Sequence, residues 1–359
     1  MDNLSTKFVD LSGYVISGKS AVIELMQEFD GYFCAGRDVE FELCRVRNGL
    51  RDLESALVDN WNPAGATLAV RKFRDLIDGM GRSPSLYNIF GQCNSFATKY
   101  DDKFHGQFTA LATEYANSLV SFQFRSQVAH PYLFRSRIQF FIDRILLKTG
   151  LRGTYKLEDI LMTVPPEKFY ILTRRFLDNL FNQHNFFSGD SKLGSSISKY
   201  ERYTTFVMSN AAEPFSPSKT LNLFNNCKQI IVDRDPRDMY LAVTQEDDRG
   251  EKKHFSISGE EDIKIFVERY RYLRQRTELI SETDERRKII MFEDLVLNYE
   301  KTVLSILEFL QEDSSLHIHK KKFFDPESSL KSVGMWRNIQ NSSEIDYISK
   351  ELPEYCRDY

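Results

Sequence analysis

Two hydrophobic periodicities follow one another near the start of the chain. Phe8, Val9 and Leu11 form an apolar run typical of a strand, and residues 13–20 have the composition of a turn. From Ala21 the apolar residues recur at the three- and four-residue spacing of a helix. These residues are Val22, Leu25, Met26 and Phe29. The pattern predicts a strand, a glycine-containing loop and a helix over residues 8–29.

The same alternation returns late in the chain. Short apolar runs predict further strands at residues 32–35, 204–208, 229–233 and 288–292. The run 229–233 is rich in β-branched residues, as buried parallel strands are. Helices are predicted at residues 218–224, 262–277 and 299–310. Strands that alternate with helices predict an α/β fold, in which a parallel β-sheet is flanked by helices.

Residues 45–203 show a different pattern, which predicts helices rich in aromatic residues and arginine. These helices are expected at residues 68–80, 104–122, 132–148 and 167–182. The third has an apolar stripe between its arginines, and we expect this stripe to face the core. Its members are Phe134, Ile138, Phe141, Ile142 and Ile145. We expect one domain over residues 1–359, with a core from residues 1–44 and 204–359 and a helical insertion at residues 45–203.

Net charge and cysteine content argue against several classes of protein. The net charge of −4 argues against a general nucleic-acid or membrane-surface binder. Five cysteines without a CxxC pair favour reduced thiols over disulfides or zinc ligands. The N-terminus lacks signal-peptide features, and no apolar run reaches transmembrane length. We therefore expect a soluble cytoplasmic protein with no nucleic-acid partner and no stable membrane insertion; the sequence leaves its oligomeric state open.

The loop at residues 13–20, GYVISGKS, matches the Walker A spacing with two glycines, a lysine and a hydroxyl. A loop that enters a helix N-terminus directs unpaired N–H groups at one point, and the helix dipole favours an anion there. Lys19 adds a positive charge and Ser20 a hydroxyl donor. The sequence predicts a site for phosphate or for an anion of similar shape.

Other charged residues follow strands of the same predicted sheet. Arg37, Asp38 and Glu40 come after the strand at 32–35, and the segment RDPRD at 234–238 comes after the strand at 229–233. The carboxyl ends of parallel strands share one edge of a sheet, where ligands bind. We expect these side chains to lie on the same edge as Lys19.

Four segments together resemble the sulfotransferase family, whose donor is PAPS (3′-phosphoadenosine 5′-phosphosulfate). They are the loop at 13–20, IIVDRDPRD at 230–238, MFEDLVLNYEKTVLSILEFL at 291–310 and K-x-x-G-x-W-R at 331–337. The resemblance covers residues 8–41 and 204–340 and omits the insertion. It implies a three-layer, P-loop-like core, transfer of a sulfuryl group from PAPS to a hydroxyl, release of PAP (the desulfated nucleotide), no metal, and an insertion on the acceptor side.

The resemblance also implies roles for individual residues. The residues at the 5′-phosphosulfate are Gly18, Lys19, Ser20 and Ala21, and Arg234 stands where the family clamps the 3′-phosphate, a task suited to a planar guanidinium. The residues that cover the nucleotide are Lys331, Gly334, Trp336 and Arg337. Two hydroxyl donors of the first loop are missing, and Ala242 replaces a serine ligand, for which Thr244 is a nearby substitute.

The family resemblance bears on the catalytic base as well. Residues 37–41, RDVEF, resemble the Asn-Glu-Val-x-Phe segment of the heparan-sulfate-type branch, whose glutamate is the base. This places Asp38 on the catalytic position, with Glu40 as the alternative on the opposite face of an extended segment. Lys19 would stabilise the leaving phosphate. Glu293 and Asp294 are expected to cap the following helix. Among the six histidines, His130 is the best candidate for the cleft.

The acceptor expected from this branch is a carbohydrate, such as a polysaccharide or a glycolipid precursor. Two other functions compete. In a P-loop kinase or NTPase, Asp233 and Ser20 would hold Mg²⁺ for ATP. In a non-catalytic nucleotide-binding protein, the missing hydroxyl ligands would need no replacement. The RDPRD segment and the Gly-x-Trp-Arg segment favour a nucleotide with a 3′-phosphate over Mg·ATP. The presence of both Lys19 and Arg234 argues against a non-catalytic protein.

Overall fold

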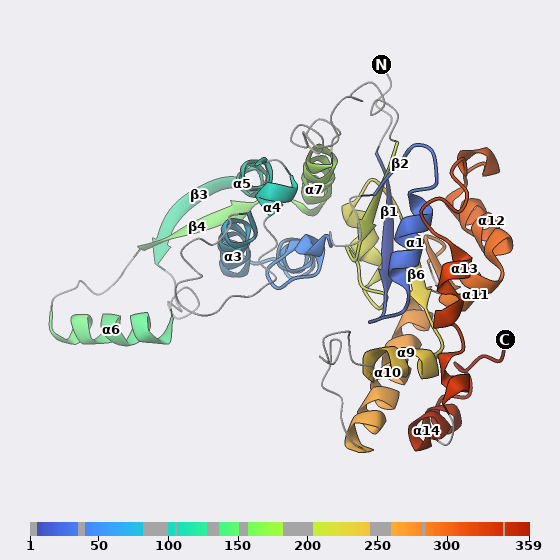
Figure 1. Ribbon diagram of the computed structural model, residues 1–359. Helices are drawn as coiled ribbons and strands as arrows, with labels where there is room; N and C mark the ends of the chain where they lie inside the picture. Colours follow the sequence, from blue (N-terminus) through green and yellow to red (C-terminus); the bar gives the residue numbers. More distant parts are fainter. Residues whose placement is uncertain are drawn as a thin grey trace. The chain divides into compact units, whose positions relative to one another are not determined.

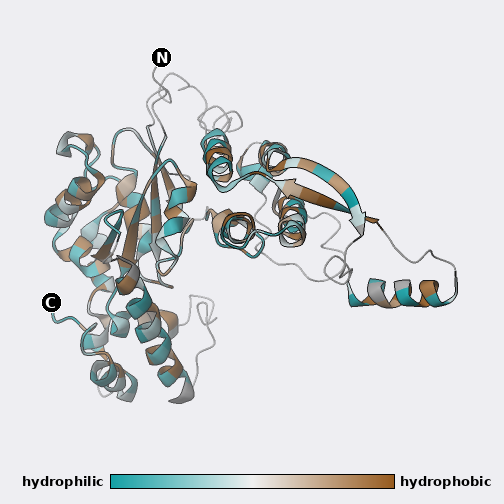
Figure 2. Ribbon diagram, turned by 180° about the vertical axis from the view of Figure 1, so that it is seen from behind, coloured by the Kyte–Doolittle hydropathy of each residue, from teal (hydrophilic) through white to brown (hydrophobic). Residues whose placement is uncertain are grey.

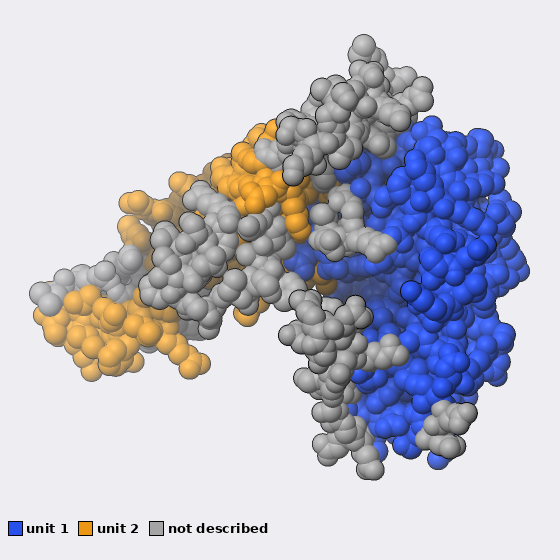
Figure 3. Space-filling view, in the orientation of Figure 1, with its two compact units in different colours: residues 1–42, 201–359 blue, residues 43–200 orange. Residues whose placement is uncertain are grey.

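The structure is a computed structural model of the 359-residue chain. It describes residues 6–34, 40–81, 100–104, 106–127, 136–150, 157–181, 204–244, 260–281, 284–339 and 342–359. The chain divides into two compact units, one from residues 1–42 and 201–359 and the other from residues 43–200 (Figure 3). The single-domain organisation expected from the sequence stays a prediction.

The first unit is built on a parallel sheet of five strands in the order β2-β5-β1-β6-β7 (Figure 1). The strands are β1 (Lys7–Gly13), β2 (Tyr32–Cys34), β5 (Thr205–Ser209), β6 (Asn226–Asp233) and β7 (Arg287–Met291). The predicted parallel sheet is confirmed. The loops that follow the five strands therefore leave the sheet at one edge.

Helices cover both faces of this sheet, because successive residues of a strand point to opposite sides. Ile230 and Val232 of β6 belong to the core cluster shared with α1 and α12, whereas Ile231 packs with residues of α9, α10 and α14. The helices of the first face are α1 (Lys19–Met26), α11 (Phe292–Leu297) and α12 (Tyr299–Leu310). Those of the second are α9 (Pro236–Thr244), α10 (Glu260–Ser281) and α14 (Ser343–Glu351). The unit has the predicted three layers.

Short helices complete this unit. They are η7 (Ser218–Leu223), η8 (Ser314–Leu316), α13 (Pro326–Ser329), η9 (Leu330–Ser332) and η10 (Met335–Asn338). Two of them, η9 and η10, lie along the segment at 331–337 that is predicted to cover the nucleotide, and α13 directly precedes η9.

The second unit is mainly helical. It comprises α2 (Leu50–Glu54), η2 (Ser55–Asp59), α3 (Pro63–Gly81), α4 (Tyr100–Lys103), α5 (Phe108–Ser118), α6 (Arg137–Lys148) and α7 (Pro166–Leu180), with η1 (Glu42–Cys44) at its boundary. Aromatic side chains join α3, α5 and α7: Tyr115 stacks on Phe176 at 4.7 Å between ring centroids, and Phe73 meets Tyr115 edge-on at 5.8 Å.

This unit also contains a two-stranded antiparallel sheet that the sequence analysis did not expect. Its strands are β3 (Val120–Gln127) and β4 (Leu157–Thr163). The helix predicted over residues 104–122 ends at Ser118, and the alternating sequence VSFQFRSQ forms β3 instead. Alternation with period two is a strand pattern, and it takes over where the helical spacing stops.

Helix α6 contains both hydrophilic and hydrophobic residues (Figure 2), and its apolar stripe does not face a core. Ile138 is 73% exposed and Phe141 65% exposed, and Ile142 and Ile145 are each almost half exposed. The expectation of a core-facing stripe was therefore wrong for this helix. Phe134, the first member expected, and the loop expected at residues 188–198 lie outside the described residues.

Candidate functional site

The loop between β1 and α1 has the geometry that an anion site requires. Gly18 precedes the helix in the left-handed region, at φ 89°, and α1 begins at Lys19. A Cβ at Gly18 would lie 2.4 Å from Cδ2 of Phe292, so a larger residue does not fit. The loop is closed by a hydrogen bond from the Ser17 N–H to the Tyr14 carbonyl at 3.1 Å. Because five residues, 14–18, separate the end of β1 from α1, the first turn of α1 lies near the carboxyl edge of the sheet.

Two hydroxyl groups flank this turn. The Ser17 hydroxyl is buried and has no hydrogen-bond partner among the described residues. Ser20 lies in the first turn of α1 and is exposed. A buried polar group without a partner is costly and marks a place where a ligand or water completes the bonding. The Ser17 hydroxyl was not singled out from the sequence.

Lys19 joins side chains from three strand ends. Its Nζ donates to Oε1 of Glu40 at 3.0 Å and to Oγ of Ser209 at 2.9 Å. The same Glu40 oxygen accepts from Nδ2 of Asn210 at 2.6 Å. The Lys19 side chain is 16% exposed and that of Glu40 is 37% exposed. The cluster places an ammonium group and a carboxylate together at the carboxyl edge of the sheet.

A buried carboxyl group fixes the loop that carries Ser209 and Asn210. Asp10 of β1 accepts hydrogen bonds from the N–H groups of Ala211 and Ala212 and from Nε2 of Gln229. Burial raises the pKa of Asp10 to about 6, against the lowering effect of these bonds. The hydrogen bonds of Asp10 order the turn that follows β5.

Arg234 follows β6 and lies beside the anion loop. Its Nη1 donates to the Ile16 carbonyl at 3.4 Å, and its Nη2 donates to the Ser332 carbonyl and contacts Sδ of Met335 at 3.4 Å. The residue is 4% exposed, and its Nε has no hydrogen-bond partner among the described residues. Burial lowers the pKa of Arg234 despite nearby carboxylates. One buried guanidinium therefore joins the loop at 14–18 to the segment at 332–335.

The segment at 331–337 is held over this region by residues of α9. The Asp238 carboxylate accepts from the N–H groups of Gly334 at 2.7 Å and Trp336 at 3.2 Å. The guanidinium of Arg237 lies 3.7 Å from the centroid of the Trp336 ring. Gly334 adopts φ 67°, which favours glycine. The structure thus brings the predicted nucleotide-covering segment to Arg234.

Arg337 and Lys331, at the ends of this segment, are both exposed. Arg337 donates to the Tyr359 carbonyl at 2.9 Å. The Thr244 hydroxyl donates within α9, to the carbonyls of Tyr240 and Leu241. Ala21 is buried in the first turn of α1. The roles of these four residues at a nucleotide stay predictions.

Asp233, the residue that would hold Mg²⁺ in a P-loop NTPase, is engaged elsewhere. Its carboxylate accepts from Nη2 of Arg274 at 2.6 Å and from Nε at 3.1 Å. The Arg274 guanidinium lies between the rings of Tyr14 and Tyr270, 3.4 and 3.5 Å from their centroids. A buried pair of this kind keeps the carboxylate from a metal ion, because breaking it would leave the arginine uncompensated.

Glu293 has a structural role, but not the capping role expected from the sequence. It lies within α11, and its Oε1 accepts from the Asp235 N–H at 2.8 Å, which fixes the turn that follows Arg234. Its other oxygen is buried without a partner among the described residues. Burial raises the pKa of Glu293 to about 7. The signal for this contact is long-range, so local sequence could not supply it.

Several predicted residues lie outside the described chain. They are Arg37, Asp38, His105, His130, His184 and His254. Glu40 is therefore the candidate base that the structure places. His317 is buried against Glu28 and Tyr299. Within the described ranges, no three His, Cys, Asp or Glu side chains gather as metal ligands.

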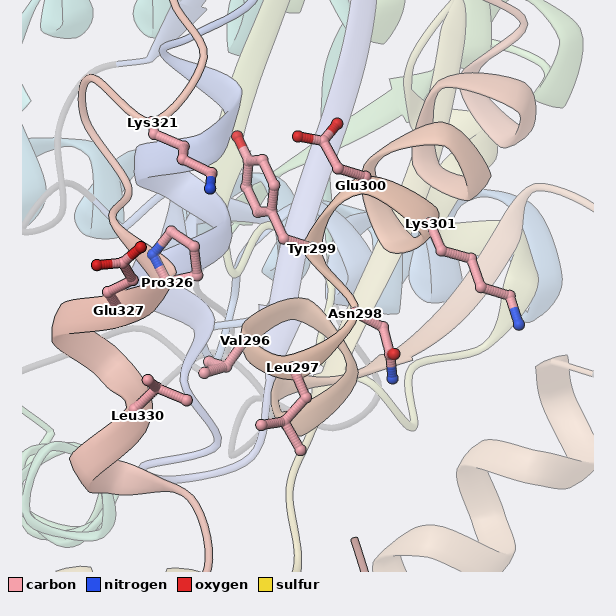
Figure 4. A pocket seen from close by; sticks show the side chains of 10 residues that line it. All are labelled: Val296, Leu297, Asn298, Tyr299, Glu300, Lys301, Lys321, Pro326, Glu327 and Leu330. Carbon is pink, nitrogen blue, oxygen red and sulfur yellow. The ribbon is translucent and has the colours of Figure 1, made fainter.

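A separate cavity of about 400 Å³ lies between α11, α12 and α13 (Figure 4). Apolar residues, including Val296, Leu297 and Leu330, line one side, and Lys321 reaches towards Tyr299 with its Nζ 5.5 Å from the ring centroid. None of its lining residues belongs to the predicted site. The cavity ends at Leu330, directly before the segment that covers Arg234.

Comparison with known proteins gave structural likenesses only. No family model and no curated protein matches the chain. A sulfotransferase domain of the Synechococcus PCC 7002 olefin synthase has a TM-score of 0.39 and 11% identity, over 100% of this chain and 98% of that one. A sulfotransferase domain from the curacin biosynthetic pathway has a TM-score of 0.37 and 12% identity, over 97% of both chains.

A third solved structure is a retinol dehydratase in complex with androsterone and the inactive cofactor PAP. Its TM-score is 0.35 at 12% identity, over 99% of this chain and 83% of that one. Likeness at this level does not establish a shared activity. Across the described helices, none is long and apolar enough to cross a bilayer.

Proposed function

We propose that this protein transfers a sulfuryl group from PAPS to a hydroxyl group of an acceptor. The observation that carries the proposal is the position of Arg234. Its guanidinium is buried beside the anion loop, has an unpartnered Nε and lies beneath the segment at 332–335. A second anion-binding group next to a phosphate loop suits a nucleotide that carries a 3′-phosphate in addition to its 5′ chain.

The donor set around the anion loop fits a phosphosulfate. The first turn of α1 supplies N–H groups and the positive end of the helix dipole, and Lys19 supplies a full charge. The unpartnered Ser17 hydroxyl would gain a partner. Gly18, at φ 89°, permits the left-handed turn from which α1 begins. These features replace, in part, the two hydroxyl donors that the sequence lacks.

The residues at the sheet edge have distinct tasks in this reaction. PAPS carries the sulfuryl group on its 5′-phosphate. When the bond between sulfur and the phosphate oxygen breaks, PAP is the leaving group. Lys19 neutralises charge that develops on the leaving phosphate. Glu40 accepts the proton of the acceptor hydroxyl, and Lys19 and Asn210 orient its carboxylate. Because Lys19 contacts both the base and the anion site, it keeps the two reacting groups close together.

We propose a carbohydrate as the acceptor on narrower grounds. The segment RDVEF and the aromatic, arginine-rich composition of residues 43–200 support it. Many aromatic rings of this unit are buried in its core, but Trp61, Phe122 and Phe124 are exposed and can stack on sugar rings, and arginines bind anionic sugars. The kinase alternative is disfavoured by the buried pair of Asp233 with Arg274. A non-catalytic nucleotide binder would have no use for Glu40 beside Lys19.

Binding calorimetry with PAP and with Mg·ATP tests the proposed donor. We expect PAP to bind without magnesium and ATP to bind weakly. Arg234→Ala should weaken PAP by about 10- to 100-fold, and weaken adenosine 5′-phosphosulfate far less, because only PAP carries the 3′-phosphate. Arg276→Ala, at an exposed position of α10, is the matched control. Preference for Mg·ATP, or equal weakening of both nucleotides, would refute the assignment.

A further inference from the structure

Helix α6 presents an apolar surface to solvent in the second unit. The surface, named here the α6 stripe, consists of Ile138, Phe141, Ile142 and Ile145, exposed by 73, 65, 49 and 46%. Their spacing places all four on one side of the helix. Large apolar side chains grouped on one exposed face mark an interaction site.

The helix is well defined by its own sequence. Ser136 caps it and accepts a hydrogen bond from the Gln139 N–H, while the Gln139 side chain accepts from the Ser136 N–H. This capping box satisfies two groups that a helix start leaves unpaired. A helix of 12 residues is nevertheless marginal in water unless its apolar face is covered. The α6 stripe therefore calls for a partner.

Positive charge lies along one border of the stripe. Arg137, Arg144 and Lys148 are separated by seven and four residues, which places them on one side of the helix, next to Phe141. All three side chains are exposed. An apolar face bordered by arginine and lysine is complementary to the surface of an anionic bilayer, where acyl chains lie below phosphate groups.

A second copy of the chain fits this surface less well. A stable protein interface covers about 800 Å² on each partner. Four side chains on a helix of roughly 18 Å offer much less than this. A lipid surface requires no complementary shape, and it accepts a short helix that lies in its plane.

We propose that α6 binds anionic lipid surfaces, with the α6 stripe at the boundary between headgroups and acyl chains and Arg137, Arg144 and Lys148 at lipid phosphates. The helix lies on the bilayer and is too short to span it. This surface is independent of the proposed sulfuryl transfer. The net charge of −4 argued against a protein that binds membrane surfaces. A local row of basic residues is nevertheless sufficient for such binding when an apolar stripe beside it also contributes.

Flotation of the full chain with vesicles tests this proposal. We expect at least about tenfold more protein bound to vesicles of phosphatidylcholine with 30% phosphatidylglycerol than to phosphatidylcholine alone. Phe141→Asp with Ile142→Asp should reduce the bound fraction about tenfold or more. Ile171→Asp is the matched control, because this α7 residue is 57% exposed and lies outside the stripe. It should bind as the unchanged chain does.

Two further variants separate the charge from the apolar contact. Arg144→Glu with Lys148→Glu should lower binding to anionic vesicles and remove most of its salt dependence. Phe141→Trp should show a blue-shifted emission that brominated lipids quench, whereas Ile171→Trp should not. Both readouts use substitutions at exposed positions, which leave the core unchanged.

Three outcomes would overturn the proposal. The first is no binding of the unchanged chain to anionic vesicles. The second is binding that survives the substitutions in the α6 stripe, which would assign it to another surface such as the lysines at 320–322. The third is a dimer, seen by light scattering, that Phe141→Asp with Ile142→Asp dissociates, since a second copy would then occupy the stripe.

Discussion

The ammonium group of Lys19 links the two halves of the proposed reaction. It has three N–H donors, and two of them point to Glu40 and Ser209. The third can serve an anion at the start of α1 without loss of either contact. The arrangement explains why the lysine is placed at the helix start rather than further along: only there can one side chain touch both the carboxylate and the anion.

Replacement of Glu40 by glutamine tests the base. Glu40→Gln keeps the oxygen that accepts from Lys19 and Asn210 but removes the basic carboxylate. We expect turnover to fall about 100-fold or more, with PAP affinity changed less than about threefold. Steady-state kinetics and calorimetry measure the two quantities. Full turnover in this variant would transfer the role to Asp38.

Sequence reasoning at the residue scale worked where a residue type has a distinctive chemistry. It placed Lys19 and Arg234 at the sheet edge, and the structure brings both to the anion loop. It missed Ser17, Ser209 and Asn210, because a serine or asparagine in a loop has many ordinary roles. The position of Ser209 and Asn210 directly after a predicted strand was the available signal.

At the scale of elements, one buried carboxylate joins α1 to a distant segment. Glu28, just after α1, accepts from the Tyr299 hydroxyl and His317 Nε2, and from three N–H groups at residues 321, 323 and 324. Burial alone would raise the pKa of Glu28, but bonds from His317 and from these N–H groups outweigh burial and lower it. The segment leads to α13 and then to the loop over Arg234.

Removal of this carboxylate should loosen the whole segment. Glu28→Ala leaves five donors without their acceptor, and we expect the free energy of unfolding to fall by about 3 kcal/mol or more. Urea denaturation measures this loss. Glu308→Ala, at an exposed position of α12, should change it by less than about 0.5 kcal/mol. Similar losses in both variants would show that the Glu28 contacts add little.

Element prediction succeeded where hydrophobic spacing is unambiguous. Helix α12 has the bounds that its spacing predicted, residues 299–310. The antiparallel pair of β3 and β4 was missed because β3 ends at Gln127 and β4 begins at Leu157, so no short turn joins the two strands and none could signal their pairing. The spacing of α6 was interpreted correctly as amphipathic, but spacing does not identify what an apolar face contacts.

Across the whole molecule, buried carboxyl groups make stability depend on pH. The pKa of Glu293 is raised by burial from 4.5 to about 7, and that of Asp10 from 3.8 to about 6. At a pH between the ordinary and the raised pKa of either group, that group is protonated in the folded chain and has lost its proton in the unfolded chain. Stability should therefore fall as pH rises through this interval and level off above about pH 7.

Thermal melting of Glu293→Gln checks this sign. The variant cannot titrate at this position but keeps an oxygen for the Asp235 N–H. We expect its melting temperature to fall less than that of the unchanged chain between about pH 5 and pH 7.5. Glu308→Gln, which is exposed, should follow the unchanged chain. Parallel curves for all three proteins would contradict the raised pKa of Glu293.

The order of strands in the sheet has a consequence for synthesis on the ribosome. β1 is the middle strand, yet its neighbours β5 and β6 begin only at Thr205 and Asn226. At about 5–20 residues per second, β1 waits on the order of 10 s or longer for its first neighbour. Residues 43–200 emerge in this interval and can complete their own core. The length of the insertion thus sets how long the nascent anion loop and its strand remain uncovered.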